Sequence, residues 1–205
     1  SNARLNADIV YDMTNISGED LPDNIDMVNG SHNGESYIAY TFYLINSGKD
    51  TLTYDSEMTI ENVTNNVDEA IRVALYVNGE KTVYGKTKSN GTGKESDCDS
   101  EFASSTKVMT SRREKFAPGD KDKFTVVIWL EGNDPDCLDN IIGGTMKLGM
   151  DGLLARQEAV SSNIANCMTP GYQRQEVSFE GQLSEMMADQ KNKEYVKSLN
   201  SVKYN

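Results

Sequence analysis

Apolar residues at every second position are the feature that most constrains this chain, because that spacing fits a β-strand and not a helix. In the stretch SYIAYTFYLINSG, Ile38, Tyr40, Phe42 and Leu44 fall on one face of an extended chain, and the opposite face is largely apolar as well. A strand that is apolar on both faces belongs in the middle of a sheet. The sequence therefore predicts a central strand here, ended by the turn signal NSG at residues 46–48.

Two other stretches repeat this pattern. AIRVALYV alternates ahead of Asn78-Gly79, a dipeptide that is typical of the type I′ turn in a β-hairpin. FTVVIWL, residues 124–130, alternates after a Pro-Gly turn at residues 118–119. The stretches ADIVYDM and TLTYDSEMTIENV are shorter candidate strands.

These strands predict the fold class of the first part of the chain. Short strands with turn signals between them indicate a mainly β fold, an antiparallel β-sandwich or jelly roll over residues 4–147, with an irregular barrel as the alternative. The polar region between Val83 and Phe116 is expected to be a long loop. Four side chains are expected in the interior: Phe42, Leu75, Ile128 and Trp129.

Composition narrows the range of functions. The chain has 205 residues and a formal net charge of −12, which argues against binding to a nucleic acid backbone. The single histidine, His32, leaves little scope for histidine-dependent catalysis. No apolar run reaches the roughly 18 residues that would indicate a membrane span. Residues 1–3, Ser-Asn-Ala, are typical of an expression scar and are left out of the fold prediction.

The acidic stretch EGNDPDCLDN is the one candidate metal site. Its carboxylates come from Glu131, Asp134, Asp136 and Asp139, and Ca²⁺ prefers several such oxygens around one point. The spacing lacks the glycine and the bidentate glutamate of an EF-hand loop, so a solvated acidic turn is the alternative. Sub-micromolar Ca²⁺ affinity is not expected, and no other cofactor is indicated.

The three cysteines show no C-x-x-C spacing, which argues against a zinc ribbon or a redox dithiol. Cys98 and Cys137 both lie in acidic loops and are a candidate disulfide pair if the chain is exported. Such a bond would close a loop of about 40 residues and stabilise the fold by about 3–4 kcal/mol. Cys167 is expected to be a small buried residue rather than a nucleophile.

Two stretches resemble the TasA/camelysin-like secreted proteins of Gram-positive bacteria. They are YIAYTFYLINSGKDTLTYD and, after FAPGD, the segment FTVVIWLEGNDPDCLDNIIGGTMKLGMD, so the resemblance covers roughly residues 5–150. It implies a secreted β-sandwich that serves as a matrix fibre subunit. The chain has no H-E-x-x-H motif, so the resemblance carries no metalloprotease activity with it.

From Thr145 onward the apolar spacing changes to three, four and seven residues, which predicts an amphipathic helix from near Leu148 to near Asn166. Pro170-Gly171 then suits a type II turn. The segment GMDGLLARQEAVSSNIANCMTPGYQRQEVSFEGQL resembles the N-terminal signature of flagellar basal-body rod proteins, and the proximal rod protein above all. By this resemblance, residues 148–190 form a rod-like helix and turn. Residues 191–205 are polar and are expected to be a tail.

The resemblance implies that this segment packs into an assembly. The residues expected to mediate it are the apolar stripe and the motif: Met150, Leu153, Val160, Asn163, Ile164, Asn166, Thr169, Pro170, Gly171 and Tyr172. In rod proteins the helix begins the chain and pairs with a C-terminal helix, whereas here it is internal. The two resemblances meet at MKLGMD, which indicates a gene fusion, a recombined gene or a designed protein.

The sequence favours a non-enzymatic extracellular structural protein: a secreted matrix-type sandwich joined to a rod segment, with itself or other rod or matrix subunits as partners. The expected location is extracellular or at the cell surface, and the flagellar basal body for the parent of the C-terminal segment. The alternative is a cell-surface module that binds polysaccharide or protein through its long loop. An enzyme that uses the carboxylates of residues 131–139 is a third hypothesis, which a deep cleft around them would favour.

Overall fold

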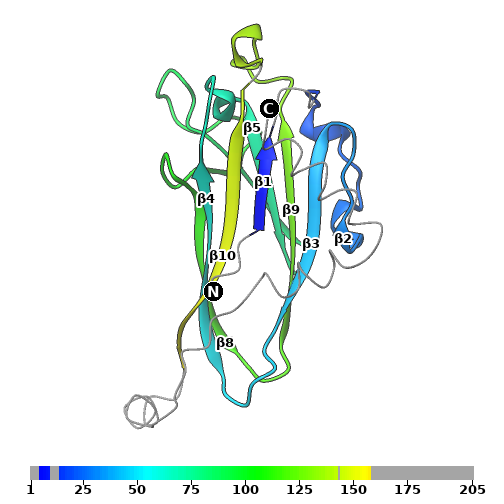
Figure 1. The fold of residues 1–205 in the computed structure, drawn as a ribbon, viewed down its shortest axis with the longest axis vertical. Coiled ribbons are helices and arrows are strands. Elements are labelled where there is room, and N and C mark those ends of the chain that lie inside the picture. The colour runs from blue at the N-terminus through cyan, green and yellow to red at the C-terminus, as the bar shows by residue number, and fades with distance from the viewer. Residues whose placement is uncertain (1–4, 10–13, 143, 158–205) are drawn as a thin grey trace.

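The computed structural model describes residues 5–9, 14–142 and 144–157, and these residues form a β-sandwich (Figure 1). Two sheets stand face to face, and their strands run along the long axis of the molecule. All strand pairs are antiparallel except that between β6 and β7. The mainly β class predicted from alternation is therefore confirmed.

One sheet has four strands in the order β1-β10-β4-β8. Their bounds are β1 Leu5–Ile9, β10 Met146–Gln157, β4 Leu52–Glu61 and β8 Lys107–Phe116. The other sheet has six strands in the order β2-β3-β9-β5-β6-β7. Their bounds are β2 Gly30–Ser31, β3 Tyr37–Ile45, β9 Lys121–Leu130, β5 Ile71–Val77, β6 Glu80–Gly85 and β7 Ser100–Glu101.

Four single turns of 3₁₀ helix lie in the connections: η1 Gly18–Asp20, η2 Ile25–Met27, η3 Val67–Glu69 and η4 Asp139–Ile141. The β5–β6 hairpin has the expected two-residue turn, because both Asn78 and Gly79 have positive φ angles (52° and 87°) and Val77 pairs with Glu80. The two strands that flank β9 are β3 and β5, so the stretches with the clearest alternation are central strands.

The main core fills the space between the two sheets. Phe42 from β3 and Phe124 from β9 stack with ring centroids 5.3 Å apart. Leu75 and Ile128 are buried in the same cluster, as expected. Each side chain of this size contributes about 1.5–3 kcal/mol on burial, so this cluster is the main source of stability.

A second cluster covers the outer face of the six-stranded sheet. Trp129 is buried there, on the opposite side of β9 from Ile128, against Leu21 and Ile25 of the N-terminal segment. That segment, in blue, runs beside β3 in Figure 1. Gly18 lies so close to Trp129 that a Cβ atom there would come within 2.9 Å of the indole ring. Apolar residues on both faces of the central strands are thus explained by two cores, one on each side of the sheet.

The expected helix from Leu148 to Asn166 is wrong over its described part. Residues up to Gln157 belong to β10, which pairs with both β1 and β4 and crosses the expected domain boundary after residue 147. The remaining residues of the expected helix, 158–166, lie outside the described part of the chain.

The apolar spacing of this segment fits both a helix and a strand, which is why the predicted helix is wrong here. Met146 and Met150 are four residues apart, so they fit a helical stripe as well as one face of a strand. Leu148 distinguishes a strand from a helix, because only a strand places it on the same face as Met146 and Met150. All three side chains are buried in the main core. Gly149 and Gly152 also disfavour a helix. Met150 is therefore covered by its own sandwich.

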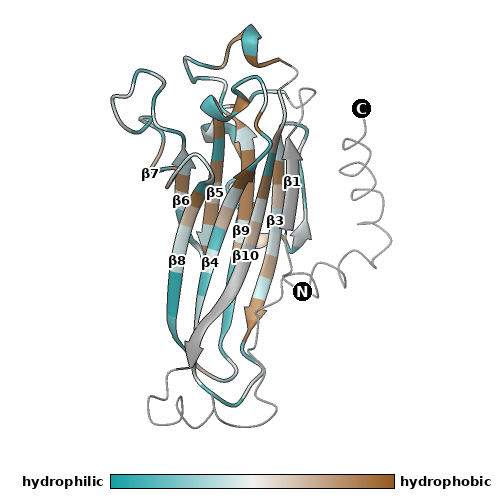
Figure 2. Ribbon diagram, turned by 60° about the vertical axis from the view of Figure 1, so that its left-hand side comes forward, coloured by the Kyte–Doolittle hydropathy of each residue, from teal (hydrophilic) through white to brown (hydrophobic). Residues whose placement is uncertain are grey.

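The long loop expected between Val83 and Phe116 is wrong for residues 107–116, which form strand β8. Its middle is polar and exposed, and Figure 2 shows most of it in hydrophilic colours, in contrast to the brown bands of β5 and β9. Among the strands that the structure describes, it pairs with β4 alone and therefore lies at the edge of its sheet. Val108, Met109 and Phe116 are buried at its two ends, which ties it to the core.

Candidate functional site

A pocket of about 660 Å³ opens on the outer face of the six-stranded sheet. Three segments that are far apart in sequence line it: η1, the loop 86–99 and the loop 131–138. Arg72 and Trp129, from the neighbouring strands β5 and β9, reach it from the sheet. The pocket thus forms where long connections fold back over the second core.

Glu131 fixes one wall of the pocket. Its carboxylate accepts hydrogen bonds from the indole N–H of Trp129 (3.0 Å) and the backbone N–H of Gly18 (2.9 Å) on one oxygen. The other oxygen accepts the backbone N–H of Asn133 at 3.1 Å. With three donors and an exposure of only 4%, this carboxylate holds η1 against β9.

Arg72 fixes the opposite wall. Its guanidinium is 1% exposed and binds both carboxylate oxygens of Asp97, at 2.8 and 3.1 Å, and Oδ2 of Asp134 at 2.5 Å. Burial by itself would lower the pKa of Arg72, but the hydrogen bonds to Asp97 and Asp134 outweigh it and raise that pKa. Arg72 therefore joins the loop 86–99 to the loop 131–138.

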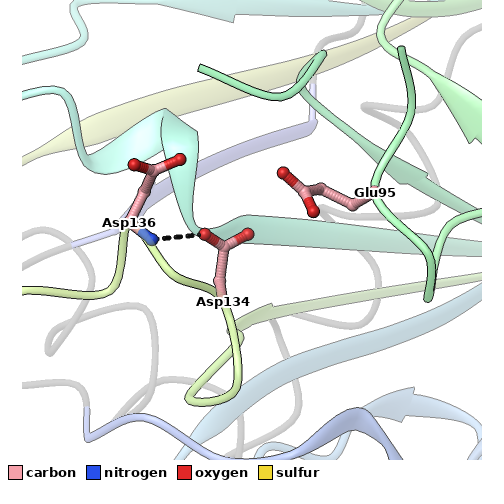
Figure 3. Close-up of side chains that lie close together, drawn as sticks. All are labelled: Glu95, Asp134 and Asp136. Carbon is pink, nitrogen blue, oxygen red and sulfur yellow. Dashed lines mark hydrogen bonds between the residues drawn. The ribbon is translucent and has the colours of Figure 1, made fainter. Parts of the chain in front are cut away.

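Three carboxylates gather beside this arginine (Figure 3). One oxygen from each of Glu95, Asp134 and Asp136 lies within 4.8 Å of the others. The backbone N–H of Asp136 donates to Oδ1 of Asp134 at 2.7 Å, and the hydroxyl of Ser89 donates to Asp136 at 3.1 Å. Such an arrangement of oxygens can hold a hard cation.

The structure brings together two of the four acidic residues proposed from the sequence. Asp134 and Asp136 converge, but Glu131 turns toward Trp129 and the exposed Asp139 begins η4, so neither belongs to the cluster. Glu95 was missed, because its contact with them joins two loops that share no periodicity. The acidic run KESDCDS was its one signal in the sequence.

The cysteines of the candidate disulfide are both free thiols in the structure. Burial raises the pKa of Cys98 to about 12, and its side chain packs in the second core beside Gly85. Burial also raises the pKa of Cys137. Both thiols are therefore poor nucleophiles near neutral pH.

The residues expected to mediate assembly divide into two groups. Met150 is a core residue, and Leu153 lies in β10 opposite Asp55 of β4. The others lie outside the described residues: Val160, Asn163, Ile164, Asn166, Thr169, Pro170, Gly171 and Tyr172.

The fold defines a β-sandwich protein with a loop-built acidic pocket. The model of the flagella basal body rod protein family matches residues 149–173, which begin inside β10 and continue beyond the described part of the chain. This match supports the rod-type segment. Among curated proteins, none matches the chain. In the described residues, no helix is long and apolar enough to cross a bilayer.

Two solved structures share a remote likeness. One is the adhesin domain of Epf from Streptococcus pyogenes, with a TM-score of 0.27 and 11% identity over 75% of this chain and 58% of that one. The other is a family two carbohydrate esterase from Cellvibrio japonicus, with a TM-score of 0.22 and 12% identity over 75% of this chain and 35% of that one. The chain thus spans between about a third and three fifths of these structures.

Proposed function

We propose that the chain is a non-enzymatic structural protein of the cell exterior, in which the β-sandwich is the folded body and the rod-type segment mediates assembly. The position of the family match carries this proposal. The match starts at residue 149, within β10, and runs to residue 173. An assembly motif whose first residues belong to an internal strand of the sandwich would be anchored in the folded body.

The chemistry of the edge strand β8 supports this choice of assembly element. An open edge strand can pair with another chain, and proteins prevent this with charged side chains and bulges. The exposed part of β8 carries the sequence SRREK, residues 111–115, and Lys115 has a positive φ angle of 53°. Arg112 also forms an ion pair with Asp55 of β4. These features disfavour assembly through β8, one of the edge strands of the sandwich, and are consistent with assembly through the rod-type segment.

The pocket chemistry supports the non-enzymatic part of the proposal. Glu131 accepts three hydrogen bonds that hold the fold, and Asp134 is paired with a buried arginine. Carboxylates committed in this way are poorly suited to proton transfer, because that role needs a group within hydrogen-bond reach of a substrate. The acidic stretch therefore serves the structure of the loops.

The proposal also includes a relation of the sandwich to the TasA/camelysin-like proteins and a location outside the cell. The stretches quoted for the TasA/camelysin-like proteins form β3, β4 and β9, which lie in the core of both sheets. Kinship over residues 5–150 would place the protein outside the cell, with matrix-type or rod-type subunits, or a second copy of the chain, as its partners.

Light scattering tests the assembly role. The full chain is expected to form dimers or larger species in the micromolar range, and a chain that ends at Gln157 is expected to be monomeric. The cut belongs after Gln157 because β10 ends there, whereas a cut before Gly149 would remove Met150 from the core. Circular dichroism checks that the shortened chain keeps its β structure. If the full chain and the shortened chain are both monomeric throughout this concentration range, the proposal is rejected.

The pocket supports a second function, recognition of a polysaccharide or protein at the cell surface. The long loop expected to bind such a ligand does line the pocket, through Lys88, Glu95 and Asp97. Trp129 lies in the same pocket and is the single tryptophan of the chain. Titration of its fluorescence with cell-wall polysaccharide tests this function, and saturable quenching by micromolar ligand would favour it over assembly.

A further inference from the structure

The large apolar side chains that are exposed gather at two places among the described residues. Met27, Val28 and Ile45 form one group, with exposed fractions of 68%, 49% and 54%. Leu138 and Ile142 form the other, 59% and 62% exposed, and they flank η4 on either side. Single apolar residues are ordinary on a surface, but a group with a charged rim marks an interaction site. The two groups are therefore candidate contact surfaces.

Side-chain contacts and strand pairing join the first group to two lysines. Lys121 lies over the ring of Tyr43, with its Nζ 3.9 Å from the ring centroid, and Nζ of Lys123 lies 4.0 Å from Sδ of Met27. In the register of β3 and β9, Ile45 pairs with Lys121 and Tyr43 with Lys123. These five residues form a continuous surface, which we call the basic patch.

The charge of the basic patch is not neutralised by the described residues. Neither Lys121 nor Lys123 forms an ion pair with any of them. The two aspartates next to these lysines in sequence, Asp120 and Asp122, pair with Arg113 of β8 instead. On a chain with a net charge of −12, this patch is a local exception. Its charge fits an acidic partner that also offers apolar side chains.

The second group has that chemistry. The acidic turn, residues 136–142 with the sequence DCLDNII, carries Asp136 and Asp139 and no lysine or arginine. Leu138, Asp139 and Ile142 are all exposed. The turn therefore offers two carboxylates beside two apolar side chains, which complements the basic patch in both respects.

The basic patch and the acidic turn lie at opposite ends of the sandwich. Lys121 begins β9, and the acidic turn follows the end of that strand at Leu130. Ten residues of strand place these ends about 30 Å apart. In Figure 1 the yellow-green turn that holds η4 stands at the top, whereas β3 runs toward the bottom to reach Ile45. The two surfaces can therefore meet only between different copies of the chain.

We propose that the basic patch binds the acidic turn of a second copy of this chain, so that copies associate end to end. Such a contact joins two different surfaces, and each pair leaves one surface of each kind open for a further copy. Both surfaces are small and largely polar, so the Kd is expected to be about 1 mM. The contact adds to assembly through the rod-type segment, which raises the local concentration of copies into this range. A chain that ends at Gln157 accordingly stays monomeric at micromolar concentration.

Carbodiimide cross-linking of the full chain tests the contact. The reagent condenses a lysine amine with a carboxylate to an amide and takes up the water itself, so only groups that touch are joined. An equal mixture of unlabelled and isotope-labelled chains at about 1 mM is expected to give peptides that join Lys121 or Lys123 to Asp136 or Asp139. Half of them should combine a labelled with an unlabelled peptide. The pair Lys107 and Glu57, 3.0 Å apart within one copy, supplies the reference without mixed labels.

Leu138→Ser locates the contact, because it removes an exposed apolar side chain and keeps every reacting group. The yield of the mixed cross-link, relative to the reference, is expected to fall about threefold. Raising the salt concentration to about 0.5 M should also lower it, because the charges are exposed. Cross-links from the two lysines that spread over the whole surface, or a Leu138→Ser variant that matches the parent, overturn the proposal.

Light scattering separates this contact from the proposed assembly role. If the full chain is oligomeric but gives no mixed cross-link between the basic patch and the acidic turn, this contact is wrong and the role of the rod-type segment stands. If the mixed cross-link forms in a full chain that is monomeric at micromolar concentration, the end-to-end contact stands and the role of the rod-type segment is wrong.

Discussion

Replacement of Arg72 by methionine is expected to lower the free energy of unfolding by about 3–5 kcal/mol. The guanidinium is 1% exposed, and the side chain of its partner Asp134 is 0% exposed. Methionine keeps much of the volume but leaves the carboxylate of Asp134 buried beside an apolar group. The loss of Asp97 as a partner also frees the loop 86–99 from β5. Urea unfolding followed by circular dichroism measures the change.

Arg112→Met is the matched control. Arg112 also makes a two-pronged contact with a carboxylate, that of Asp55, but the two side chains are 52% and 41% exposed. Solvent screening makes an exposed pair of this kind a small contribution to stability, so the change should have little effect on the free energy of unfolding. Adding Asp134→Asn to Arg72→Met should recover part of the loss, because it removes the unpaired charge. If Arg72→Met lowers the free energy of unfolding by no more than the control does, burial does not determine how much the ion pair of Arg72 and Asp134 contributes to stability.

Met150→Ala is expected to destabilise the protein by about 2–5 kcal/mol, the usual cost of truncating a buried methionine. Met150 is 1% exposed and packs in the main core together with Met58 of β4, its partner in the strand register. If residues 148–157 formed the first turns of a solvent-facing helix instead, the same change would have a small effect. Urea unfolding distinguishes the two cases.

Ile45→Ala serves as the control for this measurement. Ile45 ends β3 and is 54% exposed, so its truncation should change the free energy of unfolding by no more than about 0.5 kcal/mol. Equal, small effects at both positions would place Met150 on the surface and refute the assignment of β10.

Alternation predicted the central strands because those strands are buried on both faces. The stretches that became β3, β5 and β9 are rich in β-branched and aromatic residues, and their turns carry residues that favour positive φ angles. Alternation does not reveal strand β8, because an edge strand exposes one side and this one carries six successive polar or charged residues, 110–115. Edge strands carry charged and polar residues that prevent pairing with other chains, and these residues obscure the alternation of apolar positions.

The site was less predictable than the fold. Asp134 and Asp136 were visible as an acidic stretch, but their neighbours Arg72 and Glu95 come from a strand and a loop about 40 to 60 residues away. Contacts of this kind depend on how two long connections fold over the sheet. A single sequence carries no periodic signal for them, whereas it does for a strand.

The first residues of the rod-type signature form a strand of the sandwich, and every assignment made here for β10 depends on this. Nuclear Overhauser contacts in the isotope-labelled full chain test it most directly. We expect backbone contacts across the register of β10 and β4, between Met150 and Met58 and between Gly152 and Ser56. Successive amide–amide contacts typical of a helix through residues 149–157, with no contact to β4, would contradict it.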